Sequence, residues 1–345
     1  MVRLNRPLLA RIAQALTYAS HGKPSEVLAL TSLPLPDLGP NDVSIKILAA
    51  TVNPSDINQL EGTYPIKPAL PAVGGNEGVG EIERIGKGVK SLAVGDRVIP
   101  AKPGFGTWRT LCVTDENSVK RIPKMSVVNS AMLAVNPCTA YRMLEDFNKP
   151  NPGDWVIQNG ANSAVGRAVI QVCKIRGYKT INIIRNKPDD DVRDELLSIG
   201  ADIVFDDKED MVLSAFCSTI PPPTLGLNMV SGRATIPLLK ALGENGSLVT
   251  YGAMSRMPMS VPFGLTVFKN ITLHSYWMTK WTKEHGRSER EYEMYSEIAE
   301  WCNSGELVPP PYQERKLREF GLAMEDAFSK KQVFHTGPRG SLGTV

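Results

Sequence analysis

The sequence predicts a two-domain α/β protein in which a mostly β domain is joined to a doubly wound parallel sheet. Its length, 345 residues, exceeds the roughly 100–200 residues of one ordinary domain. Up to about residue 135 the hydrophobic pattern is that of short strands separated by glycines. Beyond that point strands alternate with helices, which is typical of a parallel sheet covered on both faces.

The first domain is predicted to be barrel-like and all-β. Residues 43–48 alternate apolar and polar side chains, and Gly95 and Asp96 form a turn that opens another apolar run. Short strands with glycine turns at this density are typical of a barrel or sandwich. We therefore assign residues 15–135 to this domain.

The end of the chain is predicted to return to the first domain. A helix predicted over 288–303 is followed by residues that have no sheet of their own. This makes the first domain discontinuous, 15–135 and 304–345, with the second domain over 136–303. From Phe334 onward no hydrophobic periodicity remains, so we expect a flexible tail.

The second domain is predicted to be a six-stranded Rossmann fold. Its helices are predicted over 164–176, 191–198 and 236–242, where apolar residues recur at helical spacing. Strands separated by such helices form a parallel sheet, and six strands match the count of a dinucleotide-binding fold. The six predicted strands are 155–159, 180–185, 202–205, 225–230, 247–252 and 271–277.

The composition excludes several function classes. Thirty-nine basic and 36 acidic residues give a net charge of +3, without the basic stripe of a nucleic-acid binder. The five cysteines are scattered and never form a C-x-x-C pair, which favours free thiols in a reducing compartment. The longest stretch without charges, 211–232, contains three consecutive prolines, so no membrane span is predicted.

The first 14 residues differ from the rest of the chain. They carry Arg3, Arg6 and Arg11, and the first acidic residue is Glu26. A basic, acid-free segment is typical of a mitochondrial transit peptide, although this one is short. The alternative is a flexible terminus with a chance run of charges. The first interpretation implies the mitochondrial matrix.

The turn after the first strand of the second domain predicts a dinucleotide site. Backbone N–H groups at the start of the following helix would bind a pyrophosphate. Of the three glycines in G-x-G-x-x-G only Gly166 is present, and Asn162 and Ser163 offer further donors, with Ala164 and Val165 opening the helix. The alternative is an ordinary strand-to-helix turn with a good N-cap.

The end of the second strand predicts NADPH as the cofactor. The strand ends in Arg185, Asn186 and Lys187, and no acidic residue occurs before Asp189. A basic group here pairs with a 2′-phosphate, whereas an acidic one binds a free ribose hydroxyl. A solvated pair of charges at a strand end is the alternative.

Several strings resemble the medium-chain dehydrogenase/reductase superfamily, over about 15–333. The glycine-rich run 75–80, followed by Gly86, Gly88 and 95–98, carries the general resemblance. AVGGNEGVG, GTWRT, VNPCTAYRML, VIQNGANSAVG and TINIIRNKPD are similar to the mitochondrial trans-2-enoyl-thioester reductases. The resemblance implies a GroES-like catalytic domain, a Rossmann domain and a homodimer.

The resemblance also implies an activity, namely NADPH-dependent reduction of enoyl-CoA or enoyl-acyl-carrier-protein in mitochondrial fatty acid synthesis. Many members of the superfamily bind a catalytic zinc, but Asn76 stands where a histidine ligand would be. No cluster of four cysteines exists for a structural zinc, so no metal is expected. The alternatives are a zinc-free quinone oxidoreductase and a cofactor-binding module without turnover.

The resemblance assigns the remaining site residues. Tyr64, in a loop rich in glycine and proline, is implied to be catalytic, either as proton donor or by orienting the carbonyl; the alternative is a loop tyrosine packed on the core. Trp277 and Trp281 would line an acyl pocket or belong to the core. The residues implied to bind cofactor are Asn136, Thr139, Tyr251, Gly252, Ala253, Met254, Tyr276, Trp277, Met278 and Lys331.

Overall fold

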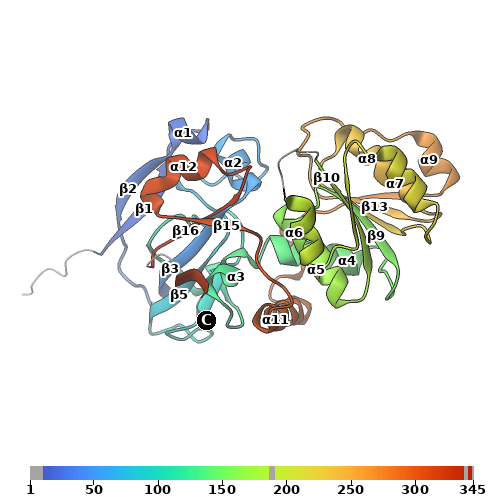
Figure 1. Cartoon of the computed structure of the whole chain (residues 1–345). Helices are drawn as coiled ribbons and strands as arrows, with labels where there is room; N and C mark the ends of the chain where they lie inside the picture. Colours follow the sequence, from blue (N-terminus) through green and yellow to red (C-terminus); the bar gives the residue numbers. More distant parts are fainter. Residues whose placement is uncertain (1–10, 186–190, 338–340, 344–345) are drawn as a thin grey trace, which may run out of the picture. The chain divides into compact units, whose positions relative to one another are not determined.

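The computed structural model describes residues 11–185, 191–337 and 341–343, which form two compact units (Figure 1). Unit 1 comprises Met1–Met132, His285–Ala299 and Pro311–Val345, and unit 2 comprises Leu133–Glu284 and Glu300–Pro310. The predicted combination of a mostly β part with a parallel six-stranded sheet is confirmed. Within the described segments, no helix combines the length and the apolar character needed to cross a membrane.

Unit 1 is built on two sheets. A seven-stranded sheet has the order β15-β16-β3-β5-β6-β8, with β7 paired to β3, and a smaller sheet has the order β2-β1-β4. The strands are β1 Ile12–Tyr18, β2 Ala29–Pro34, β3 Asp42–Val52, β4 Ala72–Val73, β5 Gly78–Ile85, β6 Arg97–Pro100, β7 Leu111–Asp115, β8 Val119–Arg121, β15 Tyr312–Arg315 and β16 Lys331–His335. The helices are α1 Pro24–Val27, α2 Pro54–Leu60, α3 Val127–Met132 and α12 Phe320–Glu325.

The two ends of the chain differ from expectation. Phe334 and His335 lie in β16, antiparallel to β3, and are 1% and 2% exposed, so the flexible tail predicted from Phe334 is wrong there. Leu342 is also buried. Four consecutive residues of β16 are buried, and such a strand lacks the alternation by which a half-buried strand is recognised. At the other end, β1 begins at Ile12, within the 14 residues expected to be a transit peptide or flexible terminus.

Unit 2 contains the parallel sheet in the order β11-β10-β9-β12-β13-β14. Its strands are β9 Trp155–Asn159, β10 Lys179–Ile184, β11 Ile203–Asp206, β12 Leu225–Asn228, β13 Ser247–Thr250 and β14 Thr272–Ser275. Numbered along the chain, this is the order 3-2-1-4-5-6 of dinucleotide-binding sheets, and the order reverses between β9 and β12. Ligands of such sheets bind outside the carboxyl ends of the strands at that point.

Helices cover both faces of this sheet. Val156 of β9 packs with α4 and α5, and the next residue, Ile157, packs with α7 and α8. Successive strand residues point to opposite faces, so both faces are apolar. The helices are α4 Asn136–Asp146, α5 Ala164–Ile175, α6 Val192–Ser198, α7 Asp210–Cys217, α8 Thr235–Ala241, α9 Phe263–Phe268 and α10 Met278–His285. A further helix, α11 Glu289–Ser304, contributes its residues up to Ala299 to unit 1.

Candidate active site

The start of α5 has the geometry expected of a phosphate site. Gly160, in the turn after β9, has a φ of +61°, which favours glycine. Ser163 is the N-cap, and its hydroxyl accepts from the Gly166 amide at 3.1 Å. A Cβ on Gly166 would lie 2.6 Å from the carbonyl oxygen of Ala161, so no side chain fits there. The helix therefore starts close against β9, with its first N–H groups directed toward the strand end.

A buried polar group at the start of α4 has no hydrogen-bond partner among the described residues, namely the side-chain amide nitrogen of Asn136. The Tyr251 hydroxyl, which follows β13, interacts with the side chain of Ser163 at the start of α5. Burial raises the pKa of Tyr251 well above its usual value, so the phenol stays protonated. Buried polar groups are nearly always satisfied, so the unpaired amide of Asn136 indicates a missing ligand. These groups fit a dinucleotide.

The other predicted cofactor residues of unit 2 lie at the ends of parallel strands or in the helices beside them. Gly252, Ala253 and Met254 follow β13, and Thr139 is buried in α4. Ala164 and Val165 form the first turn of α5, after Asn162. Tyr276 and Trp277 follow β14, and Met278 begins α10. Arg185 follows β10 and is exposed. Asn186 and Lys187 lie outside the described residues.

The sequence did not identify a buried pair of asparagines at the reversal of strand order. The Asn159 amide nitrogen donates to Asn228 Oδ1 at 2.8 Å, and Asn159 Oδ1 accepts from the backbone amides of Met229 and Val230. The two asparagines end β9 and β12 and are at most 1% exposed. They hold the two strand ends together. The available signal was a polar residue ending each of two apolar strands.

In unit 1, Tyr64 lies in a loop fixed by α2. The backbone amides of Thr63 and Tyr64 both donate to the carbonyl of Asn58, at 2.9 and 3.1 Å. The side chain of Gln59 donates to the Ile66 carbonyl at 2.9 Å, which holds the loop on its far side. The Tyr64 side chain is half-buried. The loop is therefore anchored on both sides of the predicted catalytic residue.

A buried polar network begins at the N-terminus of α2. Asn53 and Asp56 form a capping box, in which the Asn53 amide donates to Asp56 Oδ2 at 2.7 Å. The side chain of Asn53 donates to Glu77 at 2.8 Å and accepts from the Lys331 ammonium group. Burial lowers the pKa of Lys331, although the charges of Glu77 and Asp56 oppose this. Lys331 was predicted to bind cofactor, and here its contact is with Asn53.

Asp56 is a buried carboxyl group within this network. It is 1% exposed, and burial raises its pKa to about 6, against hydrogen bonds from Asn53 and Asn76 and the charge of Lys331. The unfolded carboxyl titrates near 3.9, so the folded state holds the proton more tightly. The stabilising effect of that proton is complete below about pH 4 and is lost as pH rises through about 6.

We expect this carboxyl to make wild type more stable at pH 5 than at pH 7 by about 1 kcal/mol. Equilibrium denaturation of wild type and Asp56→Asn at pH 5 and pH 7 measures this effect. Subtracting the pH-dependent change in the free energy of unfolding of the variant from that of wild type cancels the contribution of the other titrating groups. Equal pH dependence in the two proteins would contradict the shift.

The side chain of Asn76, the residue for which the sequence comparison raised the question of a zinc ligand, is an amide that is already hydrogen-bonded. Asn76 donates through its side chain to Asp56 at 2.6 Å and accepts from the Gly104 amide at 2.6 Å. In the described segments, no three His, Cys, Asp or Glu side chains are grouped so as to hold a metal ion.

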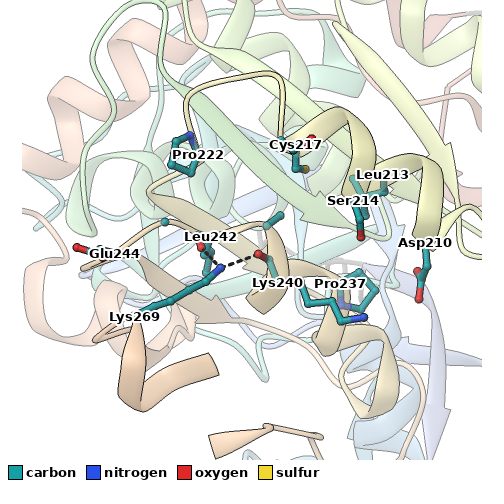
Figure 2. A pocket seen from close by; sticks show the side chains of 13 residues that line it. Asp210, Leu213, Ser214, Cys217, Pro222, Pro237, Lys240, Leu242, Glu244 and Lys269 are labelled. Atoms are coloured by element: carbon teal, nitrogen blue, oxygen red, sulfur yellow. Dashed lines mark hydrogen bonds between the residues drawn. The ribbon is translucent and has the colours of Figure 1, made fainter. Parts of the chain in front are cut away.

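A surface cavity of about 440 Å³ lies at the other edge of the parallel sheet (Figure 2). Figure 2 shows the Lys269 ammonium group beside the end of α8, where it donates to the carbonyls of Lys240 and Leu242 at 2.7 and 2.6 Å. Pro222 and Glu244, also in the lining, precede β12 and β13. The cavity therefore lies at the amino ends of the strands, away from the edge that carries the predicted cofactor residues.

Comparison with known proteins identifies the family. Residues 39–124 match the alcohol dehydrogenase GroES-like domain, and residues 164–300 match the zinc-binding dehydrogenase domain. A relative from Xenopus tropicalis, a mitochondrial enoyl-[acyl-carrier-protein] reductase, is 41% identical over 339 residues, covering 95% of this chain and 97% of that protein.

Solved structures agree with this relative. The mitochondrial 2-enoyl thioester reductase Etr1p/Etr2p heterodimer from Candida tropicalis has a TM-score of 0.88 at 32% identity, covering 94% of this chain and 100% of that one. The Etr1p/NADP/crotonyl-CoA complex has the same TM-score at 31% identity, with the same coverage. A Pseudomonas syringae quinone oxidoreductase, at 20% identity and a TM-score of 0.81, covering 94% of this chain and 100% of that one, shares the fold. The chain belongs to the enoyl-thioester reductases of the medium-chain dehydrogenase/reductase superfamily.

Proposed function

We propose that the chain reduces trans-2-enoyl thioesters, carried on coenzyme A or acyl carrier protein, to saturated acyl thioesters with NADPH. Its family membership carries the proposal, and the unpaired side-chain amide of Asn136 together with the start of α5 supports a dinucleotide at the sheet edge. The reaction belongs to mitochondrial fatty acid synthesis, and we place the protein in the mitochondrial matrix. The basic first residues, with Arg3, Arg6 and Arg11, suit an import signal.

The reaction requires a hydride at the β-carbon, a donor for the carbonyl oxygen and a proton at the α-carbon. NADPH, when bound, supplies the hydride. The phenol of Tyr64 is a hydrogen-bond donor on an anchored loop, and we assign it to the reacting acyl group. Isotope incorporation by Tyr64→Phe distinguishes protonation of the α-carbon from support of the carbonyl oxygen.

The residues that we assign to the nucleotide fall into two groups. The pyrophosphate of the nucleotide would be bound at the start of α5, by Asn162, Ser163, Ala164, Val165 and Gly166. The remaining contacts are assigned to Asn136, Thr139, Tyr251, Gly252, Ala253, Met254, Tyr276, Trp277, Met278 and Lys331. The division proposed from the sequence, with a catalytic domain over 15–135 and 304–345 and a nucleotide domain over 136–303, differs from the two compact units in that His285–Ala299 belong to unit 1 and Glu300–Pro310 to unit 2.

The first experiment follows NADPH consumption by absorbance with crotonyl-CoA and, separately, with a simple quinone. Fast turnover of the enoyl thioester supports the proposal. Activity with the quinone alone would identify a quinone oxidoreductase. Tight NADPH binding without turnover of either compound would identify a cofactor-binding module.

The preference for NADPH is assigned to Arg185, together with Asn186 and Lys187. We expect Arg185→Asp to weaken NADPH binding by about 10–100-fold, because a charge-assisted contact to the phosphate is replaced by repulsion, and not to weaken NADH binding, because a carboxylate can accept from the free ribose hydroxyl. Fluorescence titration with both nucleotides measures this. Lys174→Asp, an equal change of charge on an exposed residue in the last turn of α5, is the control. Equal weakening of both nucleotides would contradict the assignment.

We propose that the protein is a homodimer formed along β14, which ends the parallel sheet. An edge strand presents unpaired N–H and C=O groups. Helix α9 exposes Phe263, Val267 and Phe268 by 74%, 62% and 81%, which is unusual for large apolar side chains. Light scattering should give twice the chain mass of 37.7 kDa. Phe268→Glu should give a monomer and Met211→Glu, on α7, a dimer; a monomeric wild type would contradict the proposal.

A further inference from the structure

One carboxylate in unit 1 receives three hydrogen bonds from two separate segments. Asp56 Oδ1 accepts from both the backbone amide and the side-chain amide of Asn76, at 2.9 and 2.6 Å. Its Oδ2 accepts from the Asn53 amide at 2.7 Å. The pair therefore ties the start of α2 to the segment before β5. A protonated carboxyl would place a hydrogen where these donors point, so the ionised form matches the geometry better.

Asn76 also holds a second loop, the one that contains Gly104. Its Oδ1 accepts from the backbone amide of Gly104 at 2.6 Å. A Cβ built on Gly104 would lie 3.9 Å from Ile66 and 4.0 Å from Pro68, which shows that this loop faces the loop of Tyr64. The Gln59 side chain holds the same loop at the Ile66 carbonyl. The chain of contacts thus runs from Asp56 through Asn76 and Gly104 to the residues beside Tyr64.

The titratable groups around Asp56 come from two strands and from the segment before β5. Tyr18 of β1 is close enough for Asp56 to raise its pKa, and Lys331 of β16 and Glu77 lie on the side of Asn53. Lys331 reaches Asn53, so its charge acts on Asp56 across the asparagine. Burying a carboxylate in this way costs free energy that a neutral pair of side chains would avoid. A cost of this kind near a reacting group favours a functional role over simple packing.

We propose that Asp56 and Asn76 are positioning residues that hold the loops 62–68 and 102–106, and through them the Tyr64 hydroxyl, against the reacting acyl group. This inference rests on the proposed function. Neither residue touches the substrate in this scheme. The pair acts through the two loops, so its loss should lower kcat for the acyl substrate and leave NADPH affinity unchanged.

Asn76→Asp is the decisive variant. The variant keeps an oxygen acceptor for the Gly104 amide but places a second carboxyl group beside that of Asp56. At low pH the two carboxyl groups share one proton, and at high pH both are ionised and repel each other. We expect near-wild-type kcat at pH 6 and a loss of about tenfold or more at pH 8, where wild type stays active. One protein measured at two pH values is its own folding control. If the pair only stabilised the fold, kcat of the variant would not recover at pH 6, provided that both measurements are made at a temperature where the variant stays folded.

Two further variants complete the test. Asp56→Asn should lose kcat at both pH values, because an amide has a single acceptor oxygen and its nitrogen then faces either the Asn53 amide or the donors of Asn76. Asp56→Asn combined with Asn76→Asp exchanges the amide and the carboxylate and should recover part of kcat. Asp154→Asn is the matched control, because Asp154 also accepts from a backbone amide and a side-chain amide of one asparagine, Asn151, but in an exposed turn. Its kcat should equal that of wild type.

Hydrogen–deuterium exchange separates this inference from the proposed function. Peptides covering 62–68 and 102–106 should exchange faster in Asn76→Asp at pH 8 than at pH 6, after correction for the intrinsic rate, and Asp154→Asn should match wild type. If wild type fails to turn over crotonyl-CoA, the proposed function is wrong. Hydrogen–deuterium exchange still tests whether Asp56 and Asn76 hold the two loops. Unchanged exchange in both loops, or a pH profile of Asn76→Asp parallel to that of wild type, would overturn the inference.

Discussion

Tyr64→Phe is expected to lower kcat/KM for crotonyl-CoA by about 10²–10⁴-fold, the range that one positioned proton donor contributes. The substitution removes the phenol oxygen and keeps the half-buried ring. The loop should stay in place, because its anchors are the backbone amides of Thr63 and Tyr64 and the side chain of Gln59. NADPH affinity, measured by fluorescence titration, should therefore not change.

Isotope incorporation decides which role the phenol has. If Tyr64 delivers the proton to the α-carbon, product formed by the variant in D₂O should lose stereochemical purity at that carbon. If it holds the carbonyl oxygen, the purity should remain and only the rate should fall. Tyr292→Phe, which alters an exposed tyrosine of α11, is the control and should match wild type. A Tyr64→Phe enzyme with wild-type kcat/KM would remove Tyr64 from the mechanism.

The nucleotide half of the site was largely predictable from the sequence because its signals are local. Strand β9, the turn and α5 follow one another within about twenty residues, and Ser163 and Gly166 owe their roles to positions inside that unit. The strand order 3-2-1-4-5-6 then places the ends of the other strands at the same edge. The resemblance assigned Tyr251 and Tyr276 to the cofactor, and the structure places them directly after β13 and β14.

The polar network of unit 1 could not be predicted in the same way. Its members come from α2, the segment before β5, the loop at Gly104 and β16, which are far apart in the sequence. Nothing in the sequence around Asp56 distinguishes it from an exposed aspartate in the first turn of a helix. Its burial arises only when these segments pack together. The same reason explains the error at Phe334, since β16 owes its strand structure to pairing with β3.

The largest expected effect on stability lies at a buried ion pair of unit 1. The Lys120 ammonium of β8 lies 2.6 Å from Glu291 of α11, and the two side chains are 3% and 0% exposed. Glu291 also accepts from the Tyr295 hydroxyl at 3.0 Å and the Arg287 amide at 2.7 Å. Lys120→Met keeps most of the apolar volume and leaves the carboxylate buried with two neutral donors. We expect a loss of about 3–5 kcal/mol in the free energy of unfolding.

Denaturant unfolding, followed by the transition that includes unit 1, measures this loss. Lys149→Met is the matched control, because Lys149 pairs with Glu145 at 2.8 Å but is 57% exposed, so its loss should cost less than about 1 kcal/mol. The double variant Lys120→Met with Glu291→Met should recover most of the stability, because it removes the unpaired charge along with its partner. If Lys120→Met costs no more than the control, the pair is hydrated in solution and does not anchor α11 to β8. If the double variant is no more stable than the single one, the cost arises from packing around Lys120, and the charge of Glu291 is not its cause.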